Sequence, residues 1–309
     1  MLDIKFSAIG IGAAGNNLVT KFGGLDIPYL LVNSTKTDLP DYENDTSCVG
    51  ATLFEELNGT AGNRKAVQSV IKKKFKELIK EMQEGYDENI LNSDVVLVAT
   101  SAGGGTGSGT STILIDVLKT MFPDKNFILI GILPRMNDHI HMLKNALRFG
   151  KELNDLNIPY VLLDNDKVCG SLSKVHSEVN EFGRNAVDVL LGEYVDSSDI
   201  MNVDRAEWME TLTTPGYMSI HSVSVNDRSH VEKEGFTKIF LDTILEGKHA
   251  NRERDNYIKR ALMVQSLEPN IINNIDINFA NLEEEMGFCY KTFTHIQPSE
   301  KNRVEFILS

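Results

Sequence analysis

The sequence predicts an α/β protein with a doubly wound parallel sheet, a long central helix and then a smaller α+β C-terminal domain. Apolar segments at 4–9, 27–32, 94–100, 126–133 and 158–163 alternate with helical stretches. This alternation is typical of a parallel sheet with helices on both faces. Two glycine-rich segments each follow one of the apolar segments. We therefore expect a ligand cleft at the carboxyl ends of the strands, where both glycine segments fall.

The glycine-rich segment after the third expected strand is the strongest indication of function in the sequence. It runs from Ala102 to Gly109 (AGGGTGSG), between the apolar stretch 94–100 and the amphipathic stretch Thr110–Met121. Glycines let the backbone approach a ligand closely, and a following helix N-terminus adds a partial positive charge. The segment therefore predicts a cradle for the di- or triphosphate of a nucleotide. The alternative, a flexible linker, does not usually lie between a buried strand and a buried helix.

A second glycine segment follows the first expected strand and leads into a helix expected to start at Asn16. The residues of this glycine segment, Gly10 to Gly15 (GIGAAG), match the dinucleotide fingerprint G-x-G-x-x-G. That fingerprint also needs an acidic residue at the end of the second strand. Here the second strand ends in Asn33-Ser34-Thr35, and Asp38 comes late. A dinucleotide-dependent oxidoreductase is therefore the alternative from a different functional class.

The rest of the chain predicts three parts. Residues 1–172 form the expected nucleotide-binding domain, 173–203 a central helix and its connection, and 204–309 a C-terminal α+β domain. The strands expected in the last part are 216–225, 260–266, 288–296 and 303–308.

Composition and charge narrow the class of protein. The chain has 309 residues, 41% of them hydrophobic, and no apolar run as long as a membrane span, so we expect a cytoplasmic protein with no membrane span. Its three scattered cysteines fit neither a disulfide framework nor a zinc site, as is usual in a reducing compartment. A net charge of −13 argues against direct binding of nucleic acid, which needs clustered Lys and Arg.

The glycine segment also points to a family. No lysine follows Gly109, so the Walker arrangement is absent, and backbone, hydroxyls and a metal ion must meet the phosphate charge. The string Gly103–Gly109 (GGGTGSG) resembles the signature of the tubulin/FtsZ superfamily of GTP-binding filament proteins. The resemblance extends from Ile4 to about Val225. It implies a GTPase that binds GTP or GDP with Mg²⁺, without assigning a metal ligand among the side chains.

The resemblance assigns nucleotide contacts residue by residue. Asn165 and Asn180 match guanine-contacting residues, and an amide can read the polar edge of guanine. His176 falls where the family places an aromatic ring, and Asp138 in a ribose-contacting loop whose following arginine has no counterpart here. The alternatives are an ordinary turn residue for Asn165 and a packed or solvated helix histidine for His176. The implied GTP-binding residues are Gly12, Ala13, Ala14, Asn17, Asn33, Gly62, Asn63, Gly103, Gly104, Gly105, Thr106, Gly107, Ser108, Asp138, Asn165, His176 and Asn180.

The catalytic candidates lie in Met201–Trp208 (MNVDRAEW). This stretch resembles the loop that one FtsZ subunit inserts into the nucleotide site of the next. By that match Asn202, Asp204 and Glu207 would act in trans. Asp204-x-x-Glu207 is also a plausible helix capping box, and both roles can hold. Since a head-to-tail contact does not close on itself, the expected main partner is another copy of the chain, in a filament.

The branch of the superfamily remains open. The compact length, Thr35 and the C-terminal part favour the divergent TubZ and phage-tubulin group, which moves plasmid or phage DNA. A DNA-binding adaptor protein would then be a second partner. The alternative is an FtsZ-type cell-division GTPase, favoured by the match over Met201–Tyr217 and disfavoured by the missing C-terminal partner peptide.

Overall fold

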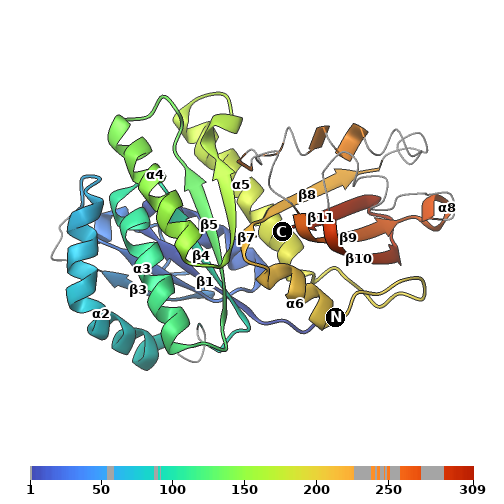
Figure 1. Cartoon of the computed structure of the whole chain (residues 1–309), viewed down its shortest axis with the longest axis horizontal. Helices are drawn as coiled ribbons and strands as arrows, with labels where there is room; N and C mark the ends of the chain where they lie inside the picture. Colours follow the sequence, from blue (N-terminus) through green and yellow to red (C-terminus); the bar gives the residue numbers. More distant parts are fainter. Residues whose placement is uncertain are drawn as a thin grey trace.

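Two β-sheets organise the chain (Figure 1). The computed structural model describes residues 2–53, 59–86, 90, 92–225, 238–240, 242–243, 247, 249–250, 258–272 and 289–309. Within them, one sheet has seven strands in the order β3-β2-β1-β4-β5-β6-β7, and the other has four in the order β10-β9-β11-β8.

The strands of the larger sheet pair in parallel throughout. They are β1 (Phe6–Ile11), β2 (Tyr29–Asn33), β3 (Cys48–Leu53), β4 (Val95–Ser101), β5 (Asn126–Leu133), β6 (Pro159–Asp164) and β7 (Gly216–Tyr217). Because all of these strands run in the same direction, their carboxyl ends all lie at one edge of the sheet. This edge carries the candidate site.

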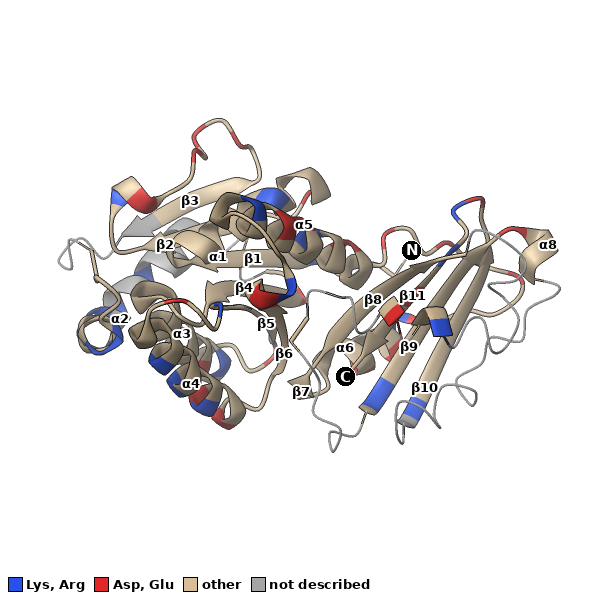
Figure 2. Ribbon diagram, turned by 90° about the horizontal axis from the view of Figure 1, so that it is seen from above, with Lys and Arg blue, Asp and Glu red and all other residues tan. Residues whose placement is uncertain are grey.

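Helices cover both faces of this sheet, as Figure 2 shows from above. On one face, α2 (Arg64–Tyr86), α3 (Gly105–Met121) and α4 (Ile140–Asp155) share an apolar core with alternate strand residues. On the other face, α1 (Gly12–Val19) and α5 (Leu172–Leu191) pack against the intervening strand residues. The strands are therefore buried on both sides, which explains their continuous apolar sequences.

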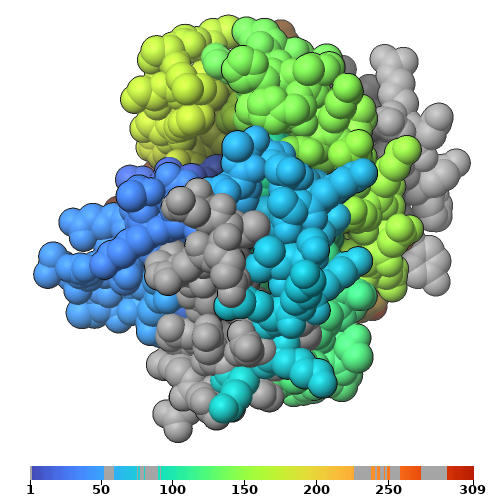
Figure 3. Space-filling model, turned by 90° about the vertical axis from the view of Figure 1, so that its left-hand side faces the viewer, coloured from blue at the N-terminus to red at the C-terminus, as the bar shows by residue number. Residues whose placement is uncertain are grey.

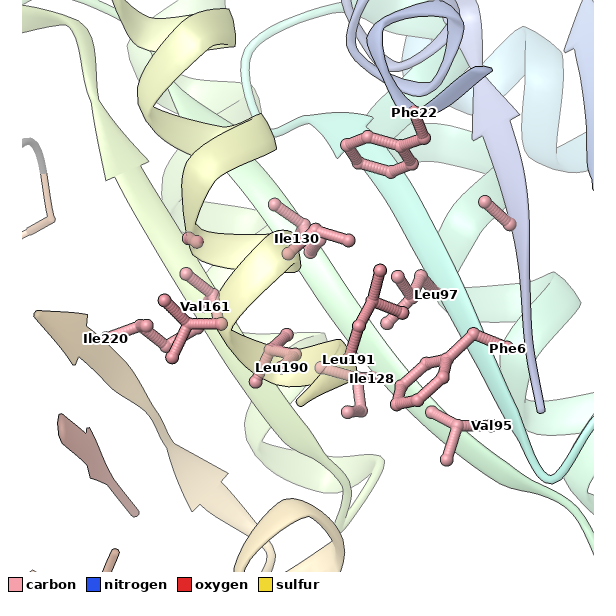
Figure 4. Packing of buried hydrophobic residues seen from close by; sticks show 14 of the residues in the cluster. Phe6, Phe22, Val95, Leu97, Ile128, Ile130, Val161, Leu190, Leu191 and Ile220 are labelled. Carbon is pink, nitrogen blue, oxygen red and sulfur yellow. The ribbon is translucent and has the colours of Figure 1, made fainter. Parts of the chain in front are cut away.

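The α5 helix also contacts the smaller sheet. Its core cluster joins Leu190 and Leu191 to Phe6, Ile128 and Ile220 (Figure 4). The strands of the smaller sheet are β8 (Ser219–Ser224), β9 (Ile258–Leu267), β10 (Cys289–Pro298) and β11 (Arg303–Leu308). Of these, β10 and β9 are parallel, and β11 is antiparallel to both β9 and β8. One helix thus links the two sheets through a shared core.

The shorter elements complete the description. They are η1 (Thr20–Leu25), η2 (Lys36–Asp38), η5 (Asn165–Lys167), α6 (Arg205–Thr213) and α8 (Pro269–Ile272). In the part of the chain that the structure describes, no helix is long and apolar enough to cross a bilayer.

The expected doubly wound sheet and smaller second sheet are confirmed, but the glycine segments differ from the prediction. The helices begin at Gly12 and Gly105 rather than at Asn16 and Thr110. Glycine costs about 1 kcal/mol in a helix, yet these positions need it for close packing. A Cβ on Gly15, for example, would lie 2.2 Å from the Ala99 carbonyl oxygen. The glycines therefore form the first turns of the helices rather than long loops.

Two strand predictions also need correction. The edge strand β3 has no counterpart in the prediction, because Cys48–Leu53 is short and contains a glycine. The expected strand 216–225 is divided into β7 and β8, which belong to different sheets. Met218 lies between the two strands and is fully buried, so the chain passes from one sheet to the other through the core.

Candidate nucleotide site and catalytic loop

A cleft of about 560 Å³ opens at the carboxyl ends of the central strands. Its volume is in the range of small-molecule and cofactor sites. Both glycine segments and the start of α5 contribute to its walls. The predicted binding residues that line it are Gly12, Ala13, Ala14, Asn17, Asn33, Gly103, Gly104, Gly105, Thr106, Gly107, Asp138, Asn165, His176 and Asn180.

Helix N-termini form one wall of the cleft. The α3 helix starts at Gly105 with Gly104 as its N-cap, and none of the described side chains caps it. The first N–H groups of a helix have no acceptor within the helix, and together with the helix dipole they favour an anion. The Gly104 N–H donates to the Ser101 hydroxyl at 2.9 Å, which fixes the turn. This wall can therefore hold phosphate without a lysine.

Three hydroxyls gather beside this wall. The Ser34 and Thr106 hydroxyls lie 2.9 Å apart, and Thr106 Oγ1 donates to Thr60 Oγ1 at 3.5 Å. Asn33 supports them, because its amide oxygen accepts from the Ser34 N–H at 2.8 Å and its Nδ2 donates to the Asp38 carbonyl. Thr60 also lines the cleft, although the residues that the prediction assigned in this segment were Gly62 and Asn63. The hydroxyls offer oxygen ligands close to the phosphate wall.

Three predicted binding residues lie behind the cleft wall. Gly62 and Asn63 pack against Gly105, whose ideal Cβ would lie 2.8 Å from the Gly62 carbonyl carbon and 3.0 Å from the Asn63 nitrogen. The Asn63 side chain accepts from the Ala66 N–H at 3.2 Å, near the start of α2. Ser108 is fully buried and donates to the Gly104 carbonyl within α3. These residues shape the wall rather than line it.

The far end of the cleft carries the residues expected to read the base. Asn165 is 9% exposed, and its Oδ1 has no hydrogen-bond partner among the described residues. The neighbouring turn is held instead by Asp164, whose carboxylate accepts from the Asp166 N–H at 2.9 Å. The Asn165 side-chain oxygen therefore does not hold this turn. This buried acceptor needs a donor, since unpaired buried polar atoms are costly, and guanine N1–H or its exocyclic amine would supply one.

The other base-site residues lie on α5. His176 is exposed at the rim and Asn180 is half-buried, one turn further along. Since His176 is exposed, it is not a packed core histidine, and its ring is accessible to solvent and to a ligand alike. Burial raises the pKa of the nearby Asp164 carboxyl.

In the loop expected to contact the ribose, an arginine precedes Asp138 rather than follows it. The Arg135 N–H donates to Asp138 Oδ2 at 2.9 Å, and its guanidinium lies 3.6 Å from Oδ1. The Met136 N–H donates to Asp166 Oδ2 at 2.8 Å and ties this loop to the turn that holds Asn165. The sequence comparison expected an arginine after Asp138, whereas in the structure Arg135, before Asp138, contacts its carboxylate.

A buried amide on α4 joins two of these segments. Asn145 is 4% exposed, and its Nδ2 donates to the carbonyls of Gly62 at 3.0 Å and Gly103 at 3.1 Å. The prediction did not include Asn145. Its only signal in the sequence is a polar residue where the helical spacing expects an apolar one, four residues before the buried Phe149.

A second network holds the start of α2. The Arg64 side chain is buried, donates to the Ser108 carbonyl at 2.9 Å and pairs with Glu152 on α4. Thr112 on α3 donates to the same carboxylate at 2.6 Å. Burial acts to raise the pKa of Glu152, but the hydrogen bonds from Arg64 and Thr112 outweigh it and lower that pKa. The three helices around the phosphate wall are thereby tied together.

The catalytic candidates form a capped helix start. Asp204 accepts from the Glu207 N–H at 2.8 Å, and Glu207 accepts from the Asp204 N–H at 3.1 Å. This is the capping box that the sequence predicted. Asn202 is exposed, and its side chain holds the preceding turn through the Ser198 N–H and carbonyl. The loop therefore presents the Asp204 carboxylate from a rigid position.

This loop lies at the opposite end of the sheet from the cleft. Arg205 pairs with Asp94 at 2.8 Å, immediately before β4, whereas the glycine segment follows β4. The seven residues of β4 span about 23 Å at ~3.3 Å per residue. The structure thus brings most of the predicted binding residues together at the cleft and the catalytic candidates together at the loop, but it does not bring the two groups together within one chain.

Comparison with known proteins identifies the family. The profile described as "Tubulin/FtsZ family, GTPase domain" matches residues 5–173, which is more than half of the chain. The chain belongs to the tubulin/FtsZ family. It is therefore a GTPase, and GTP and GDP are its nucleotides. The oxidoreductase alternative is excluded, because Gly10–Gly15 and Gly103–Gly109 both belong to this one GTPase domain.

Individual relatives agree with this assignment. The tubulin-like protein CetZ of Pyrococcus horikoshii is 26% identical over 258 residues, which cover 77% of this chain and 68% of that protein. The tubulin-like protein TubZ of Clostridium botulinum C phage is 29% identical over 173 residues, or 53% of this chain and 45% of that protein.

Solved structures share the fold. The GDP-bound CetZ1 monomer of Haloferax volcanii has a TM-score of 0.78 at 23% identity, over 99% of this chain and 93% of that one. The TubZ of Clostridium botulinum phage c-st has a TM-score of 0.75 at 20% identity, over 99% and 92%. A GTPγS-form protofilament of TubZ from Bacillus thuringiensis serovar israelensis gives 0.78 at 17%, over 99% and 87%.

Proposed function

We propose that this GTPase forms filaments, in which each copy supplies Asn202, Asp204 and Glu207 to the cleft of the next copy. The separation of loop and cleft by the length of β4 carries this proposal, because about 23 Å is too far for a side chain to reach its own nucleotide. A translation along the strand direction brings the loop of one copy to the cleft of another. Such a contact is heterologous and does not close, so it generates a filament.

The residues divide the chemistry between two copies. In the cleft, the N–H groups at the start of α3 stabilise charge that develops on the phosphates. The Asp138 carboxylate there is engaged by Arg135. On the incoming loop, the Asp204 carboxylate is exposed and orients or deprotonates the attacking water. Hydrolysis is then fast only in the assembled state.

Mg²⁺ fits this cleft as a partner of the nucleotide. Among the described residues there is no group of three His, Cys, Asp or Glu side chains that could hold a metal ion alone. Mg²⁺ usually keeps several waters and binds substrate phosphates plus one or two protein oxygens. The hydroxyls of Ser34, Thr60 and Thr106 provide such oxygens. The ion would neutralise phosphate charge that no lysine meets.

Apolar side chains at both ends support the same contact. Ile200 and Met201, beside the catalytic loop, are 50% and 46% exposed. Near the mouth of the cleft, Met136 is 76% exposed and Leu172 is 51% exposed. Burial of these side chains between two copies would contribute roughly 25 cal/mol per Å² of apolar surface.

For the biological role we propose segregation or positioning of plasmid or phage DNA in the cytoplasm, as part of the TubZ-like group. Since the chain has a net charge of −13, DNA attachment would require a basic adaptor protein. Similarity to TubZ from a phage supports this role. Cell division is the second candidate, supported by 24% identity over 251 residues to cell division protein FtsZ 1 of Methanocaldococcus jannaschii.

Mixing two inactive variants tests the division of the active site. Asp204→Ala keeps its cleft but lacks the carboxylate. Gly104→Asp keeps its catalytic loop but places a carboxylate at the N-cap of α3, where it repels phosphate, and its Cβ displaces the Ser101 hydroxyl, which lies 2.6 Å from the ideal Cβ position. Each variant alone should hydrolyse GTP slowly, and the mixture should recover activity together with filaments in electron micrographs. A mixture as inactive as its components, or a wild-type specific activity independent of protein concentration, would refute action in trans.

A further inference from the structure

The buried face of α4 contains one polar residue that the proposed function does not use. Phe149 and Leu153 continue this face and are apolar and nearly fully buried. Asn145, at the same helical spacing, is polar and is also buried, with 4% of its surface exposed. Burying an amide is unfavourable unless its donors and acceptors are paired. An amide at this buried position is therefore tolerated only if the hydrogen-bond partners of Asn145 satisfy it.

Those partners are two carbonyls that belong to different segments of the site. Nδ2 donates to Gly62, just before α2, and to Gly103, just before α3. A side-chain amide nitrogen carries two N–H groups, so one side chain uses both of its donors to join the segments. Asn145 itself does not line the cleft. It acts on the site only through the backbone of Gly62 and Gly103.

The two segments that Asn145 links, Thr60–Asn63 and Gly103–Thr106, meet at the end of the cleft where the glycines lie, and we call this meeting point the joint. There Gly62 packs against Gly105, and the hydroxyls of Thr60 and Thr106 face each other. Asn165, the residue proposed to read the base, directly follows β6. A nucleotide with its base at Asn165 extends its phosphates toward Gly105, so its terminal phosphate is the one nearest this joint.

His141 supports the joint from the same helix, one turn before Asn145. Its Nε2 and Cδ2 lie 2.9 Å from the ideal Cβ position of Gly62, which has a φ of +77°. Its ring stacks on that of His139, a residue of the cleft lining, with centroids 5.6 Å apart. In Figure 3, the light-blue chain that leads into α2 meets the green chain of α4 near the top. Gly62 is thus confined by α4 and by α3.

We propose that Asn145 is a positioning residue that makes binding selective for the triphosphate over the diphosphate. By tying Gly62 to Gly103, it keeps the Thr60 hydroxyl and the first N–H groups of α3 at the spacing that a terminal phosphate requires. GDP ends one phosphate earlier and does not depend on this spacing. The proposal rests on guanine-nucleotide binding by the family and not on filament formation.

Two substitutions of similar size test the proposal. Asn145→Asp replaces the donor with an acceptor, and Asn145→Leu removes all hydrogen bonding. We expect the affinity for GTPγS to fall about tenfold, a change of about 1.4 kcal/mol, while the affinity for GDP changes less than about twofold. Fluorescent-nucleotide titration of the full chain, at concentrations below assembly, measures both. Asn145→Ser keeps one donor in a smaller side chain, should give an intermediate ratio and serves if the larger changes prevent folding.

Asn126→Leu is the matched control. The Asn126 amide donates to the Asp94 carbonyl at 3.2 Å, at the end of the sheet away from the cleft, so its loss should lower thermal stability without changing the GTPγS to GDP ratio. Equal weakening of both nucleotides in the Asn145 variants would assign Asn145 a structural role only and overturn the proposal. Unchanged affinities would overturn it as well. Wild-type chain that binds neither nucleotide would instead contradict the assignment of the cleft.

Discussion

Asp204 has two roles that a single substitution can separate. As the N-cap of α6 it accepts from the Glu207 N–H, and as an exposed carboxylate it is our candidate for activating water in the neighbouring site. Loss of an N-cap costs about 0.5–2 kcal/mol when the replacement is alanine, but asparagine caps a helix as well as aspartate does. Asp204→Asn should therefore keep the stability of the wild-type chain.

The same change removes the carboxylate. General acid–base catalysis contributes typically 10²–10⁴-fold, so we expect GTP turnover by Asp204→Asn to fall by at least about 100-fold, with nucleotide binding and filament formation kept. Phosphate release above the assembly threshold measures turnover, and urea denaturation measures the free energy of unfolding. Asp204→Ala should show the same loss of turnover together with lower stability. Turnover by Asp204→Asn within a few-fold of wild type would show that capping is the whole role of Asp204.

Three further changes test the cleft and its support. Asn165→Leu removes the unpaired buried Oδ1. It should reduce the preference for GTP over ATP by roughly 5- to 100-fold, as the loss of one buried hydrogen bond implies. Competition binding measures this preference, and an unchanged value would contradict base reading by Asn165. Gly62 has a φ of +77° and lies against His141. Gly62→Ala should therefore destabilise the chain by about 1 kcal/mol or more and also weaken GTP binding. Melting curves recorded with and without GTP separate the two effects. The pKa of Glu152 is lowered, so its contact with Arg64 stabilises the fold above the unfolded-state pKa of about 4.3 and loses this effect as the pH falls through the folded-state pKa. Since the Glu152 side chain is 38% exposed and solvent screens the pair, Glu152→Gln should lower stability at pH 7 by only about 1 kcal/mol or less and flatten its decline on acidification. Parallel acid-denaturation curves for the two chains would contradict this.

The parts of the fold that the sequence predicts are those determined by local pattern. Continuous apolar runs such as 126–133 identify buried parallel strands, because such strands are covered on both faces. The cleft follows from the glycines, since a glycine segment between strand and helix places N–H groups at the carboxyl edge of a parallel sheet. The capping box at Asp204 is also local and is confirmed at both hydrogen bonds.

The supporting residues depend on contacts far apart in sequence. Asn145 lies 83 positions from Gly62, and Arg64 lies 88 from Glu152, so neither periodicity nor spacing connects them. Arg135 precedes Asp138 instead of following it, and only the turn of the loop brings the two side chains together. The helix starts at Gly12 and Gly105 were mispredicted for a related reason. Glycine is a poor helix former in isolation, and tertiary packing decides its conformation here.

The length of the sheet links binding to assembly. Cleft and loop lie at the two ends of β4, with the sheet between them. A copy free in solution can therefore bind GTP with a complete phosphate wall but without the carboxylate of Asp204, so on the proposed mechanism it stores the nucleotide. On the same proposal, addition of the next copy would supply the carboxylate and bury the apolar residues at both ends in the same event. If the terminal phosphate lies beside Gly62 and Gly103, as we propose, its hydrolysis would remove a group next to the proposed contact and would weaken that contact.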